Sequence, residues 1–277
     1  MSTANEAPPA REQRPVHVRT TVWRPGGAFL RVHRFATTEP GDATFVFLHG
    51  IGVSSRYFRP LAMRLAAHGE VLLVDLPGFA GLRRPTTALD IGGFAEVVAA
   101  ALDDAEVTGA IVLAQSMGTQ VATELLATRP DLAHGAVLVG PTVDAAARSI
   151  PAQVLRFART VPHEPVRMRR IASRAYLACG PRWYARTLPA MINYPIEHRI
   201  RAVEGPLTLV RGDRDAVTPP AWIRTLLAAA PDASARTVPG AAHSVVLDHA
   251  DEMADAALEV LVRTHTRGRD RSGQAQP

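Results

Sequence analysis

The chain of 277 residues has no lysine, a single cysteine and few aromatic residues, which make up 5% of it. The lone Cys179 excludes an internal disulfide and cannot by itself form a metal site, a pattern typical of a reducing compartment. No apolar run reaches the roughly 18 residues of a membrane span, and the N-terminal segment lacks the apolar core of a signal peptide. We therefore expect a soluble, cytoplasmic protein without a membrane span.

All basic residues other than histidine are arginines, and they concentrate in one segment. The formal net charge is +5, yet ten arginines and only three acidic residues lie between Pro141 and Ile200. The rest of the chain is therefore slightly negative. A nucleic-acid-binding protein more often carries runs of lysine and arginine with interleaved aromatic residues. We expect no nucleic-acid binding.

Apolar strand-like runs alternate with helical patterns along most of the chain. Apolar residues make up 47% of it and charged residues 21%, as in ordinary globular proteins. Continuous apolar strands separated by helices predict an α/β fold, with a mostly parallel central sheet and helices on both faces. The runs at 16–23 and 30–36 are expected to form an antiparallel hairpin.

The strand pattern stops at residue 141 and returns only after residue 204. The intervening segment holds helical fragments interrupted by prolines, and we interpret it as an inserted helical lid. The predicted organisation is a core in two parts, an insertion, and two polar ends expected to be disordered. In order, these are a disordered arm at 1–15, core at 16–140, lid at 141–204, core at 205–263 and a disordered tail at 264–277.

A serine between small residues follows one of the apolar runs. Residues 114–118 are Ala-Gln-Ser-Met-Gly, and a helical pattern comes next. On a sharp strand-to-helix turn the serine backbone is strained, and the positions two before and two after it must be small. Ala114 and Gly118 satisfy this demand, so the pattern is typical of a nucleophile elbow that exposes Ser116. The plain alternative is a serine that caps a helix.

A nucleophilic serine needs a base and a group that orients the base. His243 follows the last predicted strand, and the loop after the preceding strand offers Asp213 and Asp215. The ends of parallel strands meet at one edge of a sheet, so these side chains are expected to converge with Ser116. The alternative for His243 is an ordinary surface histidine.

With serine, acid and histidine in this order, the chain resembles the α/β-hydrolase fold superfamily, in its lid-bearing branch, over roughly residues 28–263. The segment His49-Gly50-Ile51-Gly52 resembles the oxyanion loop of that family. The resemblance implies that the amides of Ile51 and Met117 bind the oxyanion. It also implies that His49 supports the turn rather than transferring protons. Ala114, where glycine is usual, is a mild departure.

The resemblance also orders the candidate acids. The acid of the family lies three residues beyond the strand-end glycine and before an apolar-Thr-Pro stretch, which selects Asp215 over Asp213. Asp144, which follows the strand before the lid, corresponds to a position that some members use. It remains an alternative acid.

A serine at the elbow disfavours dehalogenases and epoxide hydrolases, whose members of this fold use aspartate there. We expect a carboxylesterase-like serine hydrolase that needs no cofactor and no metal, and that cleaves an ester, thioester or related acyl bond through an acyl-enzyme on Ser116. The alternatives are a carbon–carbon bond hydrolase of the meta-cleavage type, and an acyltransferase or thioesterase of secondary metabolism. A non-catalytic ligand-binding homologue is less favoured, because the triad is intact.

The predicted lid carries the signals for specificity. Its aromatic residues are expected either to line an apolar pocket or to hold the lid on the core: Tyr176, Trp183, Tyr184 and Tyr194. Its arginines are expected either to be solvated, to grip an anionic group of the substrate, or to receive an acidic carrier protein. The sequence leaves these alternatives open.

Overall fold

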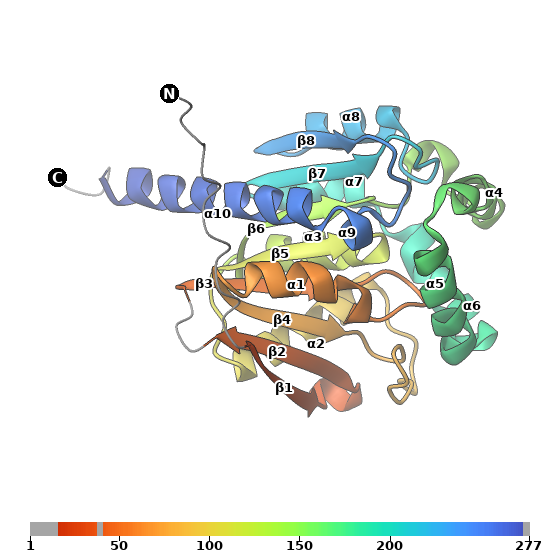
Figure 1. The fold of residues 1–277 in the computed structure, drawn as a ribbon, viewed down its shortest axis with the longest axis horizontal. Coiled ribbons are helices and arrows are strands. Elements are labelled where there is room, and N and C mark those ends of the chain that lie inside the picture. The colour runs from red at the N-terminus through yellow and green to blue at the C-terminus, as the bar shows by residue number, and fades with distance from the viewer. Residues whose placement is uncertain (1–15, 38–40, 274–277) are drawn as a thin grey trace, which may run out of the picture.

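The computed structural model describes residues 16–37 and 41–273 of the chain. Their strands form one eight-stranded sheet in the order β1-β2-β4-β3-β5-β6-β7-β8 (Figure 1). The β1–β2 and β2–β4 pairs are antiparallel, and the other five pairs are parallel. The predicted α/β class and mostly parallel sheet are confirmed. The strands are β1 (Val16–Trp23), β2 (Leu30–Thr37), β3 (Ala43–Leu48), β4 (Gly69–Asp75), β5 (Ala110–Gln115), β6 (Ala133–Val139), β7 (Leu207–Gly212) and β8 (Ala233–Val238).

Helices cover both faces of the sheet, because the central strands are apolar on both sides. On β3, Phe45 and Phe47 belong to one core cluster and Val46 and Leu48 to the other, as the two-residue period of a strand requires. Full burial of such side chains stabilises the fold by about 1.5–3 kcal/mol each. One cluster includes α1 (Arg59–Leu65), α9 (Val245–Asp248) and α10 (Ala250–Gly273); the other includes α2 (Ile91–Asp104), α3 (Met117–Thr128) and α8 (Pro220–Ala229).

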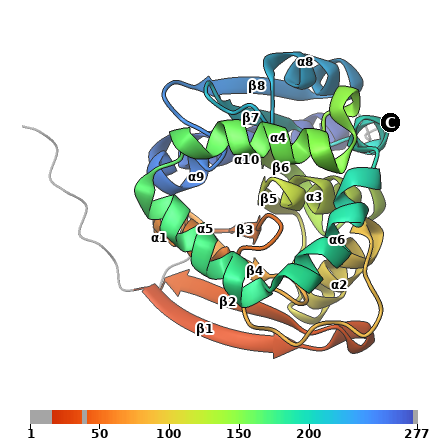
Figure 2. The ribbon, with the colours of Figure 1, turned by 90° about the vertical axis from the view of Figure 1, so that its right-hand side faces the viewer.

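The segment between β6 and β7 is helical throughout its regular structure, with no strand among its residues, all of which the structure describes. Prolines separate its helices: Pro165 is the N-cap of α5 and Pro195 the N-cap of α7. Figure 2 shows α4, α5 and α6 arranged around the edge where the parallel strands end. The helices are α4 (Ile150–Thr160), α5 (Val166–Cys179), α6 (Pro181–Asn193) and α7 (Ile196–Arg199). We call residues 141–204 the insertion.

The prediction of a disordered tail at 264–277 was wrong over most of its length. Helix α9 ends at Asp248, and after His249 helix α10 continues to Gly273. The later turns are tied to the sheet, because Arg263 donates to the Leu207 carbonyl (3.2 Å) and Arg267 to Asp232 (3.0 Å). Residues 274–277 and the predicted arm at 1–15 lie outside the described residues.

Within the part of the chain that the structure describes, no helix combines the length and the apolar character needed to cross a membrane.

Candidate active site

Ser116 occupies the turn between β5 and α3. Its φ of 54° and ψ of −126° lie in a region that residues other than glycine rarely adopt. Its side chain makes no capping hydrogen bond to the described helix that follows, so the helix-cap alternative does not hold. A Cβ at Gly118 would lie 2.2 Å from the Leu48 carbonyl oxygen, which explains the need for a small residue two positions on. The turn is the strained elbow expected from the sequence.

His243 and Asp215 meet at the ends of β8 and β7. The Nδ1 atom of His243 lies 2.8 Å from Asp215 Oδ2, while Asp215 Oδ1 accepts from the amides of Val217 (2.8 Å) and Thr218 (3.2 Å). Since the carboxylate accepts, Nδ1 carries the proton and Nε2 of the neutral ring is free to act as a base.

The two buried groups shift each other's ionisation. Burial alone would raise the pKa of Asp215, but the His243 ring and the donors to the carboxylate outweigh it, and the pKa is lowered. Burial alone would lower the pKa of His243, but the charge and hydrogen bond of Asp215 raise it above its ordinary value. The imidazole is therefore a stronger base than an isolated one.

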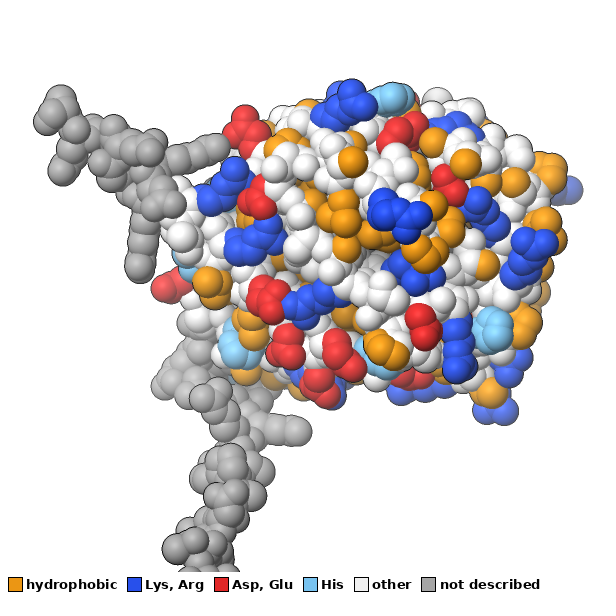
Figure 3. All heavy atoms as spheres, turned by 90° about the horizontal axis from the view of Figure 1, so that it is seen from above, with side chains coloured by type: hydrophobic (Ala, Val, Ile, Leu, Met, Phe, Trp, Pro, Cys, Tyr) orange, Lys and Arg blue, Asp and Glu red, His pale blue; other side chains and the backbone are white. Residues whose placement is uncertain are grey.

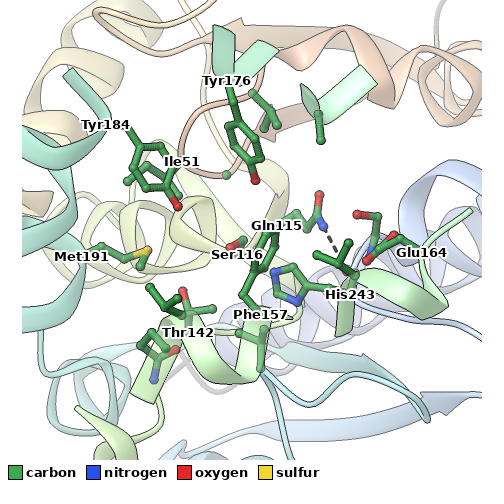
Figure 4. A pocket seen from close by; sticks show the side chains of 18 of the residues that line it. Ile51, Gln115, Ser116, Thr142, Phe157, Glu164, Tyr176, Tyr184, Met191 and His243 are labelled. Carbon is green, nitrogen blue, oxygen red and sulfur yellow. Dashed lines mark hydrogen bonds between the residues drawn. The ribbon is translucent and has the colours of Figure 1, made fainter. Parts of the chain in front are cut away.

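Gly140, at the end of β6, leaves the space for the imidazole ring. Its φ is +58°, and a Cβ there would lie 2.7 Å from Cε1 of His243 and 3.5 Å from Oδ2 of Asp215. Gln115, directly before Ser116, donates its side-chain amide to the His243 carbonyl (3.0 Å; Figure 4). The elbow and the histidine loop are thus linked. Neither the space at Gly140 nor the contact of Gln115 was predicted from the sequence, although Gln115 is adjacent to the serine.

The structure separates the two alternative acids from the histidine. Asp213 is exposed at the surface. Asp144 forms an ion pair with Arg156 (2.7 Å) and accepts from the Ala146 amide (2.9 Å). Of the three predicted acids, the one brought to His243 is Asp215.

The predicted oxyanion loop passes beside the serine. A Cβ at Gly50 would lie 3.0 Å from Ser116 Cβ and 3.5 Å from its Oγ, so the backbone at Gly50 passes close to the serine. Ile51 is the next residue of this loop. Met117 is the first residue of α3, and an N–H at that position has no acceptor within its own helix. The loop and the helix start are therefore next to the serine, where the resemblance predicts two oxyanion donors.

His49 is a buried member of the same turn. Its Nδ1 donates to the Gly50 carbonyl (2.7 Å), and its Nε2 accepts from the Leu76 amide (3.0 Å). Burial lowers the pKa of His49, so the ring stays neutral and both nitrogens are used in the turn. This arrangement agrees with the supporting role expected for His49.

A cavity of about 310 Å³ lies between the insertion and the strand ends. Ser116, Gln115 and His243 line it from the core, and side chains of α4, α5 and α6 line it from the insertion (Figure 4). The insertion contributes mainly apolar and aromatic groups: Val154, Phe157, Met168, Tyr176, Tyr184, Leu188 and Met191. Such walls favour an apolar part of a ligand next to the serine.

The aromatic residues of the insertion divide between the two expected roles. Tyr176 and Tyr184 line the cavity, and their rings meet edge-on with centroids 5.6 Å apart. Trp183 instead packs edge-on against Phe79 of the core at 6.3 Å, and the Tyr194 hydroxyl donates to Glu124 on α3 (2.8 Å). Tyr176 and Tyr184, like Phe157, therefore shape the cavity, whereas Trp183 and Tyr194 hold the insertion on the core.

The arginines of the insertion also divide. Arg148 and Arg199 pair with Glu197 and Glu124 (both 2.7 Å), and Arg169 lines the cavity. Five other arginines, two from the core and three from the insertion, line a separate groove of about 930 Å³ between α5 and the segment at 53–63. They have no ion-pair partner among the residues whose side chains the structure describes. These are Arg56, Arg59, Arg167, Arg170 and Arg174, which we call the arginine groove. Figure 3 shows basic side chains spread over the end of the molecule that carries the insertion.

Glu164 is a further cavity residue that the sequence argument did not single out. It lies between α4 and α5, is buried, and accepts from the Ser244 amide (3.0 Å). The only signal in the sequence is that it is one of three acidic residues in an arginine-rich segment.

Comparison with known proteins gives consistent results. A model described as "Alpha/beta hydrolase family" matches residues 45–256. A curated relative, the pimeloyl-[acyl-carrier protein] methyl ester esterase of Xanthomonas campestris pv. campestris (strain B100), is 26% identical over 76% of this chain and 92% of its own length.

Two solved structures illustrate the similarity of fold. The enol-lactonase from Burkholderia xenovorans LB400 superposes with a TM-score of 0.73, at 18% identity over 87% of this chain and 100% of that one. A thermophilic esterase from Thermogutta terrifontis superposes with a TM-score of 0.72, at 19% identity over 91% of this chain and 99% of that one.

Proposed function

This chain belongs to the alpha/beta hydrolase family, and we propose that it cleaves an ester, thioester or related acyl bond of a small to medium substrate through an acyl-enzyme on Ser116. The observation that carries the proposal is that Ser116 and His243 line the same cavity. Ser116 lies in a strained elbow, and His243 Nδ1 is hydrogen-bonded to the buried Asp215. A base oriented in this way makes a serine nucleophilic.

The reaction proceeds in two steps. His243 Nε2 takes the hydroxyl proton as Ser116 Oγ bonds to the acyl carbon, and the same proton passes to the leaving group when the carbon–leaving-group bond breaks. A water then loses a proton to His243 and displaces Ser116, which regains its proton. We assign the amides of Ile51 and Met117 to the oxyanion, a contribution worth about 3 kcal/mol per donor in related sites.

The insertion is proposed to act as the lid that selects the acyl group. Its apolar side chains provide most of the cavity wall facing the serine. They favour an acyl chain without charge next to the scissile bond, because an apolar wall does not repay the desolvation of a charged group.

The curated relative is named for an ester carried on an acyl-carrier protein. We propose that an acidic carrier presents the acyl group to this chain as well, and that it docks on the arginine groove. The groove lies on the other side of α5 from the cavity, and its five arginines have no ion-pair partner in the part of the chain whose side chains are described. A carrier-linked ester should then show a kcat/KM that falls with salt, whereas a small neutral ester should not.

Covalent labelling tests the proposed nucleophile. A fluorophosphonate probe should label the wild-type protein at Ser116 and leave the Ser116→Ala variant unlabelled. A burst of p-nitrophenol from a short-chain ester should accompany labelling. Labelling of the alanine variant at the wild-type rate would remove Ser116 from its role.

A substrate panel defines the reaction class. Esters, thioesters and β-diketones of matched size should be compared by kcat/KM, because the same triad serves acyl and carbon–carbon bond hydrolysis. Matched neutral and anionic esters, assayed at low salt, test whether Arg169 grips an anionic group at the cavity.

A further inference from the structure

The turn between α4 and α5 contacts the loops of both the acid and the histidine. Thr160 Oγ1 accepts from the amide of Ala216, the residue after Asp215 (3.0 Å). Glu164 Oε1 accepts from the amide of Ser244, the residue after His243 (3.0 Å). The insertion therefore reaches past the cavity walls to the backbone that carries the triad.

The second oxygen of Glu164 is unusual. The residue is only 9% exposed, and Oε2 is buried without a hydrogen-bond partner among the residues that the structure describes. A buried carboxylate is normally paired, because desolvation of an unpaired charge is costly. Glu164 lines the same cavity as His243, and Figure 4 shows it on the histidine side of that cavity. His243 gains a positive charge in this cavity when it takes a proton, and that charge can compensate the unpaired Oε2.

The ionisation of the pair agrees with this geometry. Burial raises the pKa of Glu164, and the His243 ring and the Ser244 amide oppose that rise. The charge of Glu164 in turn adds to that of Asp215 in raising the pKa of His243.

Apart from Asp215 and Glu164, the described groups that face His243 carry no negative charge. The elbow contributes Gln115 and Ser116, and the end of β6 contributes Gly140 and Thr142, all of them uncharged. From α5, burial raises the pKa of Tyr176 and keeps its hydroxyl neutral, and Arg169 is the cation that lines the cavity. The carboxylates acting on the imidazole are Asp215 and Glu164.

We propose that Glu164 is a positioning residue for His243: it holds the histidine loop through the Ser244 amide and stabilises the imidazolium form with a second buried carboxylate. The inference rests on the proposed role of His243 as the base. It gives the insertion a part in the chemistry, in addition to shaping the cavity.

The variant Glu164→Gln tests the charge, since its amide oxygen can still accept from Ser244. The acid limb of kcat/KM, which reports the base of the free enzyme, should move to lower pH by about one unit, because loss of a nearby negative charge weakens the base. The maximal kcat/KM should fall about tenfold, the change that one pKa unit represents. Glu164→Ala should show the same shift and a lower maximum, because it also releases the Ser244 amide.

Asp213→Asn is the matched control. It removes one negative charge from the loop that carries Asp215, but Asp213 is exposed, so the acid limb should stay in place. Thermal melting of each variant separates a loss of folding from a change in the base. An acid limb in Glu164→Gln that coincides with that of the wild type would overturn the proposal, whatever happens to the maximal rate.

A titration that needs no turnover separates this inference from the proposed function. In the Ser116→Ala background, the ring carbon and proton of His243 can be followed by NMR against pH, with and without Glu164→Gln. A His243 pKa lowered by Glu164→Gln supports the inference even if no ester is hydrolysed. An unchanged His243 pKa contradicts it even if the protein proves to be an active esterase.

Discussion

The strand-end loops and the insertion contribute to the site in different ways. The loops hold Ser116, Asp215 and His243 through backbone geometry and buried hydrogen bonds, and a single missing Cβ at Gly140 makes room for the ring. The insertion contributes apolar walls, two tyrosines and Glu164, and the ion pair of Arg199 with Glu124 fastens it to the core. Changes in the loops should therefore affect the rate of the chemical step, whereas most changes in the insertion should alter the choice of substrate.

The largest expected effect distinguishes Asp213 from Asp215, the two acids of the loop between β7 and α8. Asp215→Asn should lower kcat by about 10⁴-fold, because the asparagine no longer fixes the His243 tautomer or stabilises the imidazolium. Asp213→Asn should leave kcat within about twofold. Steady-state kinetics on one ester decides between them, and equal losses in both variants would contradict the assignment of the acid.

Gly140→Ala should have the next largest effect. The added Cβ would stand 2.7 Å from Cε1 of His243, so the ring must shift, and a misplaced base typically costs about 10²-fold in kcat. Gly240→Ala is the control, because Gly240 has a similar positive φ (+74°) with nothing within 4 Å of an added Cβ. If both variants lose the same activity, backbone strain rather than the clash is responsible.

Met168→Ala tests the role of the insertion in selection. Met168 lines the cavity from α5, and its truncation should raise the preference for a longer acyl chain by about tenfold, the range expected for apolar pockets. The kcat for the best substrate should change little. Leu177→Ala, on the same helix but 82% exposed, should leave the chain-length profile of p-nitrophenyl esters unaltered. An equal change of the chain-length profile in both variants would show that the cavity wall does not set the chain-length preference.

The smallest expected effect is on pH dependence. The pKa of His243 is raised, so the wild-type kcat/KM should fall as the pH drops through a midpoint above the ordinary imidazole value of about 6.5. Above that midpoint the ring is neutral and the base is available. A pH–rate profile of a neutral ester measures it, and a midpoint below the ordinary value would contradict the dominance of the two carboxylates.

Much of the core could be predicted because its signals are local. The apolar runs predict the parallel strands, and the small residues around Ser116 predict the elbow, since both depend on backbone geometry within a few residues. The helical tail was missed, because its contacts from Arg263 and Arg267 reach segments far away in the chain. A polar composition alone does not distinguish an exposed helix from a disordered segment.

The orientation of side chains in the insertion could not be predicted from local sequence patterns. Tyr176 and Trp183 belong to one arginine-rich, aromatic segment, yet one lines the cavity and the other packs on Phe79. The direction of each side chain depends on how α5 and α6 lie over the strand ends, and proline-separated helical fragments do not encode that placement. The same holds for the arginines, of which some are tied in ion pairs and others line the arginine groove.

The fold class, the serine elbow and the order of the three candidate residues can be predicted from the sequence alone, because strand period and turn strain are properties of short segments and chain order is read directly. The tertiary structure brings Asp215, the acid that the resemblance selects over Asp213 and Asp144, to His243, because β7 and β8 are neighbours in the sheet. The contact of Glu164 with Ser244, across 80 positions of the chain, depends on how the insertion packs on the ends of the sheet, and no short segment of the sequence encodes that packing.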